Sequence, residues 1–215
     1  MRASLIPIAV GCVDSTAHAE PRYELSVGSS ARALRSPSAN ALTDRNLGGA
    51  AFGCARDLGI ALGPASVWAE AGVTTGSADG AMFQTLSTQL DTLDLAGGLR
   101  ARVPLHRLIT ASARVELGAQ RVRIDIADHA GTSASDHGWG RMASAGAALD
   151  LVARPGARFG FGVRVEIGYV MAQAISLTPH RLIASDVLML AMTDAALGKL
   201  DLGGPTLGAS LVGQF

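Results

Sequence analysis

Apolar and polar residues alternate with a period of two along most of the chain. Residues 113–118 (ARVELG) and 163–168 (VRVEIG) place Val, Leu and Ile alternately with Arg and Glu, and residues 23–33 and 67–74 follow the same rule. Successive side chains of a β-strand point to opposite faces, so this period produces one apolar face and one polar face. The apolar faces are long enough to cross a membrane, which takes about 9–11 residues of a tilted strand.

Turn signals divide the alternating segments into strands. Short breaks that contain Gly or Pro fall at residues 63–65, 104–106 and 154–156. Longer polar gaps fall at residues 35–46, 79–85, 127–138 and 178–197. Short and long connections alternate, which places all the long loops on one side. The sequence therefore predicts an all-β fold, an eight-stranded antiparallel up-and-down transmembrane β-barrel.

Two strands change phase, and one residue does not fit. Leu90 has the opposite parity to the leucines that follow it, and we expect a β-bulge near Thr92 to restore the apolar face. A similar shift after Gln120 would return Val122 and its apolar neighbours to that face. The pattern does not account for Arg56, which occupies an apolar position between Cys54 and Leu58.

Composition narrows the class of protein. Only 17% of the residues are charged, the mean hydropathy is +0.29, and the formal net charge is +0. No run reaches the roughly 18 apolar residues of a spanning helix. Balanced charge without a basic run argues against nucleic acid as a partner. The alternatives are an apolar soluble domain and a membrane barrel.

The first 19 residues have the pattern of an export signal. Arg2 precedes a short apolar run, and Ala17-His18-Ala19 has the small-x-small form of a cleavage site. Cleavage after Ala19 would leave one barrel domain over residues 20–215, with Cys54 as its single cysteine and no disulfide.

The composition of the polar face indicates which face lies inside. It is rich in Gly, Ser, Thr and Ala, and the chain has one lysine, Lys199, whereas a solvated face would carry many Lys and Glu. A narrow barrel interior suits small residues and a few compensating ions, and buried charges there must pair. We expect a lumen ionic network formed by Glu70, Asp94, Arg100, Arg102, Arg114, Glu116, Asp150, Arg164 and Glu166. Tyr23, Trp139 and Tyr169 fall near predicted strand ends, as interfacial aromatic residues do.

The C-terminal segment carries a resemblance to a known family. Leu207, Ala209, Leu211 and the terminal Phe215 alternate with small or polar residues. This pattern resembles the small outer-membrane β-barrel proteins of the OmpA-type transmembrane class. The resemblance implies that these four residues form the signal read by the barrel-assembly machinery, that both chain ends are periplasmic, and that outer-membrane lipid surrounds a monomer.

One segment contains residue types that could support catalysis. Residues 127–138 hold Asp128, His129, Ser133, Asp136 and His137, the components of a hydrolytic triad or a two-His metal site. Their spacing matches no metal motif, so we expect an exposed polar loop, no metal and no cofactor. Residues 178–197 could cap a short helix or extend strands beyond the membrane.

The expected role is non-enzymatic, structural or in surface interaction, with at most very narrow conductance because eight strands leave little free lumen. Two alternatives remain: a secreted soluble barrel that binds an apolar ligand, and an outer-membrane enzyme that modifies lipids. The partner of the long loops is not identified by the sequence.

Overall fold

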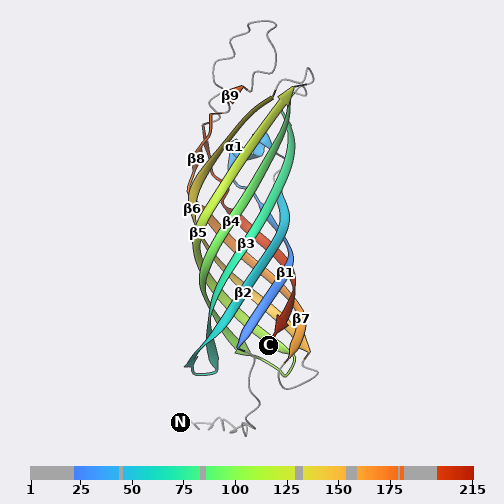
Figure 1. The fold of residues 1–215 in the computed structure, drawn as a ribbon, viewed down its shortest axis with the longest axis vertical. Helices are drawn as coiled ribbons and strands as arrows, with labels where there is room; N and C mark the ends of the chain where they lie inside the picture. Colours follow the sequence, from blue (N-terminus) through green and yellow to red (C-terminus); the bar gives the residue numbers. More distant parts are fainter. Residues whose placement is uncertain are drawn as a thin grey trace, which may run out of the picture.

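The chain folds into a tall, tilted barrel (Figure 1). The computed structural model describes residues 22–43, 46–82, 86–128, 133–153, 159–178, 180–181 and 198–215. Eight long strands form the wall within these residues: β1 (Tyr23–Ala33), β2 (Asn46–Leu62), β3 (Ala65–Met82), β4 (Leu86–Pro104), β5 (Ile109–Asp128), β6 (Ser133–Ala153), β7 (Gly160–Ala172) and β11 (Gly204–Gln214). Each pairs antiparallel with the next, and β11 pairs with β1, which closes the ring. The predicted eight-stranded up-and-down barrel is confirmed.

The two ends of the barrel differ. Strands β3 to β6 rise above the others at one end, which we call the loop end (Figure 1). The short elements α1 (Pro37–Leu42), β8 (Ile175–Ser176), β9 (His180–Arg181) and β10 (Lys199–Leu200) belong to this end. The C-terminus and the described turns after β2 and β4 lie at the other, the turn end. Gly63 has a φ of 63° in the predicted turn between β2 and β3, a conformation that favours glycine.

The wall is apolar outside and charged inside. On β5, Val115 and Leu117 are 60% and 73% exposed, whereas Glu116 between them is 8% exposed. On β7, Ile167 is 62% exposed and Arg164 is 2% exposed. A soluble protein has the opposite arrangement, so this surface fits a hydrocarbon environment.

The polarity reverses at the loop end. Leu90, Val122 and Ile124 are fully buried inside, and Arg123 and Asp125 face outward. The β4–β5 register is continuous from Leu86 to Pro104, so the bulge expected near Thr92 and the phase shift expected after Gln120 are both wrong. The side chains keep their alternation, and the environment of each face changes instead.

A compact apolar core fills the loop end. We call this set the loop-end core: Leu34, Ala39, Leu42, Leu47, Ala78, Leu90, Val122, Ile124, Ile175, Leu177, Leu200 and Leu202. Residues of α1 and of the segments before β11 pack there against the inner faces of the long strands. Most of the predicted loops at residues 79–85 and 127–138 are strand, because these segments support one wall of this core.

Where an irregularity does occur, it lies at the turn end of β2. The β2–β3 register shifts between Asp57 and Ile60, and Gly59 there has a φ of 69°. The Gly59 N–H donates to Asp57 Oδ1 at 2.9 Å, which holds the bulged backbone.

Glycine allows the strong coiling of the wall. A Cβ on Gly98 would lie 2.0 Å from the Val115 carbonyl oxygen, and one on Gly162 would lie 2.1 Å from that of Leu151. Both positions therefore require glycine for the close approach of the neighbouring strand. The described residues contain no helix that is long and apolar enough to cross a membrane. The expected export signal, the turn at residues 154–156 and most of residues 178–197 lie outside the described residues.

Candidate functional site

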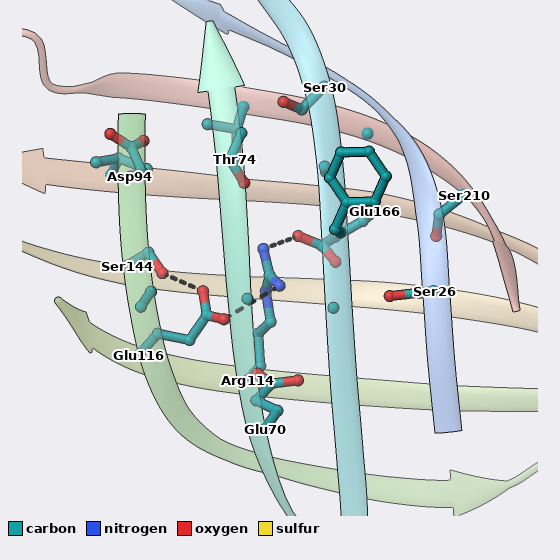
Figure 2. Close-up of a pocket in the computed structure, with 18 of the residues that line it drawn as sticks. Ser26, Ser30, Glu70, Thr74, Asp94, Arg114, Glu116, Ser144, Glu166 and Ser210 are labelled. Carbon is teal, nitrogen blue, oxygen red and sulfur yellow. Dashed lines mark hydrogen bonds and ion pairs between the residues drawn. The ribbon is translucent and has the colours of Figure 1, made fainter. Parts of the chain in front are cut away.

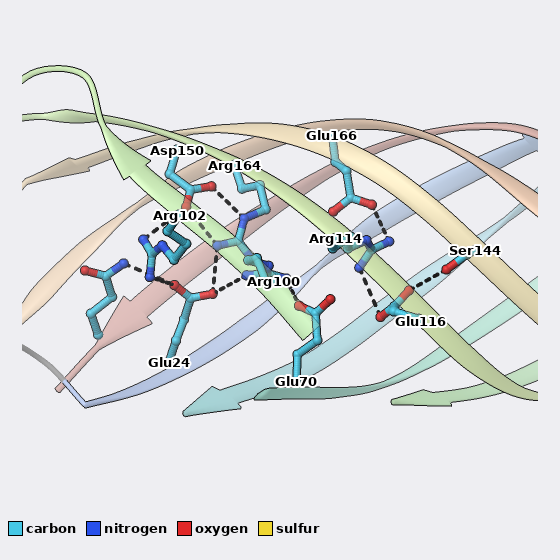
Figure 3. A network of polar contacts seen from close by, with 11 residues as sticks. Glu24, Glu70, Arg100, Arg102, Arg114, Glu116, Ser144, Asp150, Arg164 and Glu166 are labelled. Atoms are coloured by element: carbon cyan, nitrogen blue, oxygen red, sulfur yellow. Dashed lines mark hydrogen bonds and ion pairs between the residues drawn. The ribbon is translucent and has the colours of Figure 1, made fainter. Parts of the chain in front are cut away.

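The charged lumen is the most distinctive site of the molecule (Figure 3). Its charged side chains come from β1 and β3 to β7, at the inward positions of each strand. All nine residues expected in the lumen network lie there and take part in ion pairs, together with Glu24 and Arg32.

Glu24 is the centre of the cluster nearest the turn end. Its Oε1 accepts from Arg100 Nη1 at 2.8 Å and from Arg164 Nη2 at 2.7 Å. Its Oε2 accepts from Arg102 Nη1 at 2.9 Å and from Gln214 Nε2 at 3.1 Å. Glu24 is 2% exposed, so one carboxylate ties together strands from opposite sides of the ring.

Asp150 completes this cluster. It accepts two hydrogen bonds from Arg164, at 2.6 and 2.9 Å, and one from Arg102 at 3.2 Å. The guanidinium of Arg102 also stacks over the Trp68 ring, with Cζ 4.7 Å from its centroid. We call Glu24, Arg100, Arg102, Asp150 and Arg164 the Glu24 cluster.

A second cluster lies farther toward the loop end, around Arg114. Arg114 forms ion pairs with Glu166 and, at 3.4 Å, with Glu116. Ser144 Oγ donates to Glu116 Oε2 at 2.7 Å (Figure 3). Glu70 contacts Arg100 and so stands between the two clusters. The repeated Arg-x-Glu spacing does not pair locally at residue 164, because Arg164 crosses the lumen to Glu24 and Asp150.

Arg32 and Asp94 form a third pair near the loop-end core. Gln120 Nε2 donates to Asp94 Oδ1 at 2.8 Å, and Arg32 Nη1 donates to the Leu202 carbonyl at 3.4 Å. This pair therefore joins the wall to the segment before β11.

A polar cavity of about 130 Å³ remains between these groups (Figure 2). Its lining includes the hydroxyl residues Ser26, Ser30, Thr74 and Ser210 together with Arg114, Glu116 and Glu166. Four of the lumen side chains have buried polar atoms without a hydrogen-bond partner: Arg32 Nε, both carboxylate oxygens of Glu70, Arg114 Nε and Gln120 Oε1. A polar space of this size is large enough to hold water.

Aromatic and arginine side chains mark the rims of the apolar surface. At the turn end, Tyr23 stacks on Phe215 with ring centroids 6.1 Å apart, and Arg56 Cζ lies 5.7 Å from the Tyr23 centroid. This contact explains Arg56, since it faces outward at the rim rather than into the apolar surface. Trp139 is exposed beside Arg121 on the neighbouring strand, and Arg35 Cζ lies 5.6 Å from the Tyr169 ring centroid.

The last strand, β11, closes the ring by pairing with the first strand, β1. Leu207, Ala209 and Leu211 face outward on β11, and the Phe215 N–H donates to the Tyr23 carbonyl at 3.0 Å. The Tyr23 N–H donates back to the Phe215 carbonyl at 2.9 Å. The two ends of the barrel sheet are thus hydrogen-bonded to each other.

Of the residues of the catalytic hypothesis, the structure describes the side chains of Ser133, Asp136 and His137, and the Asp136 carboxylate is hydrogen-bonded to backbone rather than to the His137 ring. Asp136 accepts hydrogen bonds from the backbone N–H of His137 at 2.7 Å and of Thr178 at 2.6 Å, and the His137 side chain is exposed. His129 and the Asp128 side chain lie outside the described part of the chain. Within that part, no three His, Cys, Asp or Glu side chains are placed to hold a metal ion.

Sequence reasoning placed Glu24 and Arg32 on the polar face but did not include them in the ionic network. Alternation gives the face of a residue and not its height along the barrel axis. That height depends on the strand register around the ring, in which β1 pairs with β2 and β11, and β11 pairs with β7.

No family model and no curated protein matches the chain. Solved structures of similar fold include Ail, the attachment invasion locus protein of Yersinia pestis, at 12% identity and a TM-score of 0.45, covering 91% of this chain and 97% of that one. Neisserial surface protein A (NspA) is similar at 7% identity and a TM-score of 0.49, covering 89% and 95%. The likeness is one of overall fold. The closed ring and the inverted polarity of this chain are established by its own strand pairing and side-chain burial.

Proposed function

We propose that the protein is an outer-membrane β-barrel with a structural or surface-interaction role, whose lumen is filled rather than open. The observation that carries this proposal is the inversion of the wall, with bulky apolar side chains outside and paired charges inside. The soluble-barrel alternative needs the opposite arrangement over the same strands. In a membrane barrel this apolar outer surface contacts lipid. Lipid, unlike water, does not disfavour exposed apolar side chains.

In this proposal the side chains of the lumen residues fill the interior of the barrel. Arginine and carboxylate side chains from opposite walls meet in the Glu24 cluster, and the loop-end core lies beyond the polar cavity. A side-chain layer at each end leaves no wide path, so we expect at most very narrow conductance. The loop end supplies the surface for any partner outside the membrane.

The first test is fractionation with gel mobility. Folded protein should partition with the outer membrane, require detergent for extraction, and change its electrophoretic mobility after boiling. Recovery in the soluble periplasmic fraction, or mobility unaffected by heat, would contradict the proposal. Planar bilayer recording of the purified protein then tests the filled lumen, and a large stable conductance would exclude it.

Insertion is the second part of the proposal. Residues 1–19 serve as the export signal, and Leu207, Ala209, Leu211 and Phe215 as the signal for the assembly machinery. Phe215 also pairs with Tyr23 at the seam, so its loss removes two backbone hydrogen bonds and an aromatic contact between the first and last strands. Deletion of Phe215 should reduce outer-membrane yield more than export across the inner membrane. The matched control is Phe52→Ala, which alters an exposed aromatic residue of β2 that is not beside Phe215.

A further inference from the structure

The ion pairs of the lumen contain unequal numbers of acids and bases. Among the described residues, six carboxylates take part: Glu24, Glu70, Asp94, Glu116, Asp150 and Glu166. Five guanidinium groups face them: Arg32, Arg100, Arg102, Arg114 and Arg164. Six acids against five bases leave one excess negative charge if every group is ionised.

The excess lies around the cavity. Asp94 has Arg32, while Glu24 and Asp150 share Arg102 and Arg164. Three carboxylates then remain for two guanidinium groups: Glu70, Glu116 and Glu166 share Arg114 and Arg100. Arg100 also donates to Glu24, which reduces what it offers to Glu70.

Glu70 and Glu166 have the fewest partners among the described carboxylates of the lumen, one ion pair each, and Glu70 is the more deeply buried, with its side chain 3% exposed against 16% for Glu166. As a whole residue Glu70 is 8% exposed, neither of its oxygens accepts a hydrogen bond, and Arg100 forms its one ion pair among the described residues. The positions that pair with it on the two neighbouring strands, Ala55 of β2 and Gly98 of β4, carry no donor side chain.

The other charged groups around Glu70 come from several strands. β1 contributes Glu24, β4 contributes Arg100, β5 contributes Arg114 and Glu116, and β7 contributes Arg164 and Glu166. β11 and β6 contribute hydroxyl groups, Ser210 and Ser144, on the cavity wall. These acids and bases belong to the lumen set in which six carboxylates face five guanidinium groups.

An uncompensated ion in such a space is costly, and carboxylates that share a site commonly retain a proton between them. A bound metal ion is a poor alternative, since no three acidic or histidine side chains of the described residues are placed to hold one. We propose that the lumen binds one proton at neutral pH and that Glu70 carries it as a neutral carboxyl group.

This step takes one proton from solvent and breaks no bond in the protein. The polar cavity provides the space in which water can deliver the proton to Glu70. When Glu70 is neutral, five ionised acids face five bases, so the stability that this group contributes is present at lower pH and is lost as rising pH removes the proton. The inference concerns the folded barrel and goes beyond the proposed cellular role.

Infrared spectroscopy of the folded barrel in lipid vesicles tests the inference. At neutral pH the wild type should show the carbonyl band of a buried protonated carboxyl group, and Glu70→Gln should lose it. Asp125→Asn is the matched control, because Asp125 pairs with Arg123 on the outer face of β5 and lies outside the lumen set, so this variant should keep the band. Heat-dependent gel mobility establishes that each variant is folded.

A wild-type spectrum without this band at neutral pH would overturn the inference, as would a band that persists in folded Glu70→Gln. If Glu70→Gln does not fold, a pH series on the wild type decides alone. The band should then fade as pH rises while the barrel remains folded, and a band absent throughout the series would overturn the inference.

Discussion

The membrane wall and the loop end are built from the same strands with opposite polarity. On β5, the outward side chains change from Val115 and Leu117 to Arg121 and Arg123, while the inward ones change from Glu116 to Val122 and Ile124. The backbone ladder runs through this change without a break. Solvent, not strand geometry, therefore sets which face is apolar at each height.

This difference also separates two ways of stabilising an interior. The wall is held inside by ion pairs and hydrogen bonds, because its apolar side chains are used on the lipid face. The loop end has water outside, so burial of the loop-end core can drive its packing as in a soluble protein. The effect of a substitution on stability should consequently depend on the inward or outward face in opposite ways in the two regions.

The largest effect should come from breaking the Glu24 cluster. Glu24→Gln removes a charge that three arginines share in a buried site, and loss of one partner of a buried ion pair costs about 3–5 kcal/mol. Urea unfolding of the barrel in lipid vesicles, followed by Trp fluorescence, measures the free energy of unfolding. A change as small as that of an exposed charge would show that the cluster does not stabilise the wall.

The matching test in the other region is Ile124→Ala. Ile124 is fully buried in the loop-end core, where truncation of a large aliphatic side chain costs about 2–5 kcal/mol. The control is Ile167→Ala, since Ile167 is a similar side chain that is 62% exposed on the wall. If Ile124→Ala destabilises no more than Ile167→Ala, the loop end has no packed core of its own.

Val165→Arg examines the lipid face directly. Val165 is 52% exposed at the outer surface of β7, and an arginine near the bilayer midplane costs about 2–4 kcal/mol in a membrane barrel. Nitroxide labels give an independent measurement once Cys54 is replaced by Ala. A label at position 165 should be relaxed by oxygen dissolved in the bilayer, and one at position 166 should not. Relaxation of both by a water-soluble reagent alone would refute the inverted wall.

Much of this architecture could be predicted from the sequence. The eight strands follow from a period of two and from turn residues, and their facing in the wall follows from the small residues and few charges of the polar face. The loop end could not be predicted, because Leu90 and Val122 were compared with the lipid face and interpreted as phase slips. Their parity is regular, and a change from lipid to water outside explains the polarity that a bulge was expected to repair.

The sequence predicts which residues belong to the ionic site better than it predicts which of them pair with each other. Parity identifies inward charges, and nine of the eleven were included in advance. Partners depend on strand tilt and stagger, which bring Glu24 of β1 to Arg102 of β4 and Arg164 of β7 across the lumen. Of the two Arg-x-Glu segments, only Arg114 and Glu116 pair locally.

The smallest effect should come from Arg123→Ala, on the same face of β5 as Leu117 but beyond the apolar surface. Arg123 pairs with Asp125 at 2.8 Å in an exposed position, and the hydrogen bond and charge of Asp125 raise the pKa of Arg123, so Arg123 stays charged at neutral pH. Exposed ion pairs contribute little because water and salt screen them and ordering the side chains costs entropy. We expect the urea midpoint to be unchanged, at low and at high salt. Leu117→Arg, six positions away on the lipid face, should lower it clearly, and equal responses of the two variants would mean that the outer surface of β5 meets a single environment along its length.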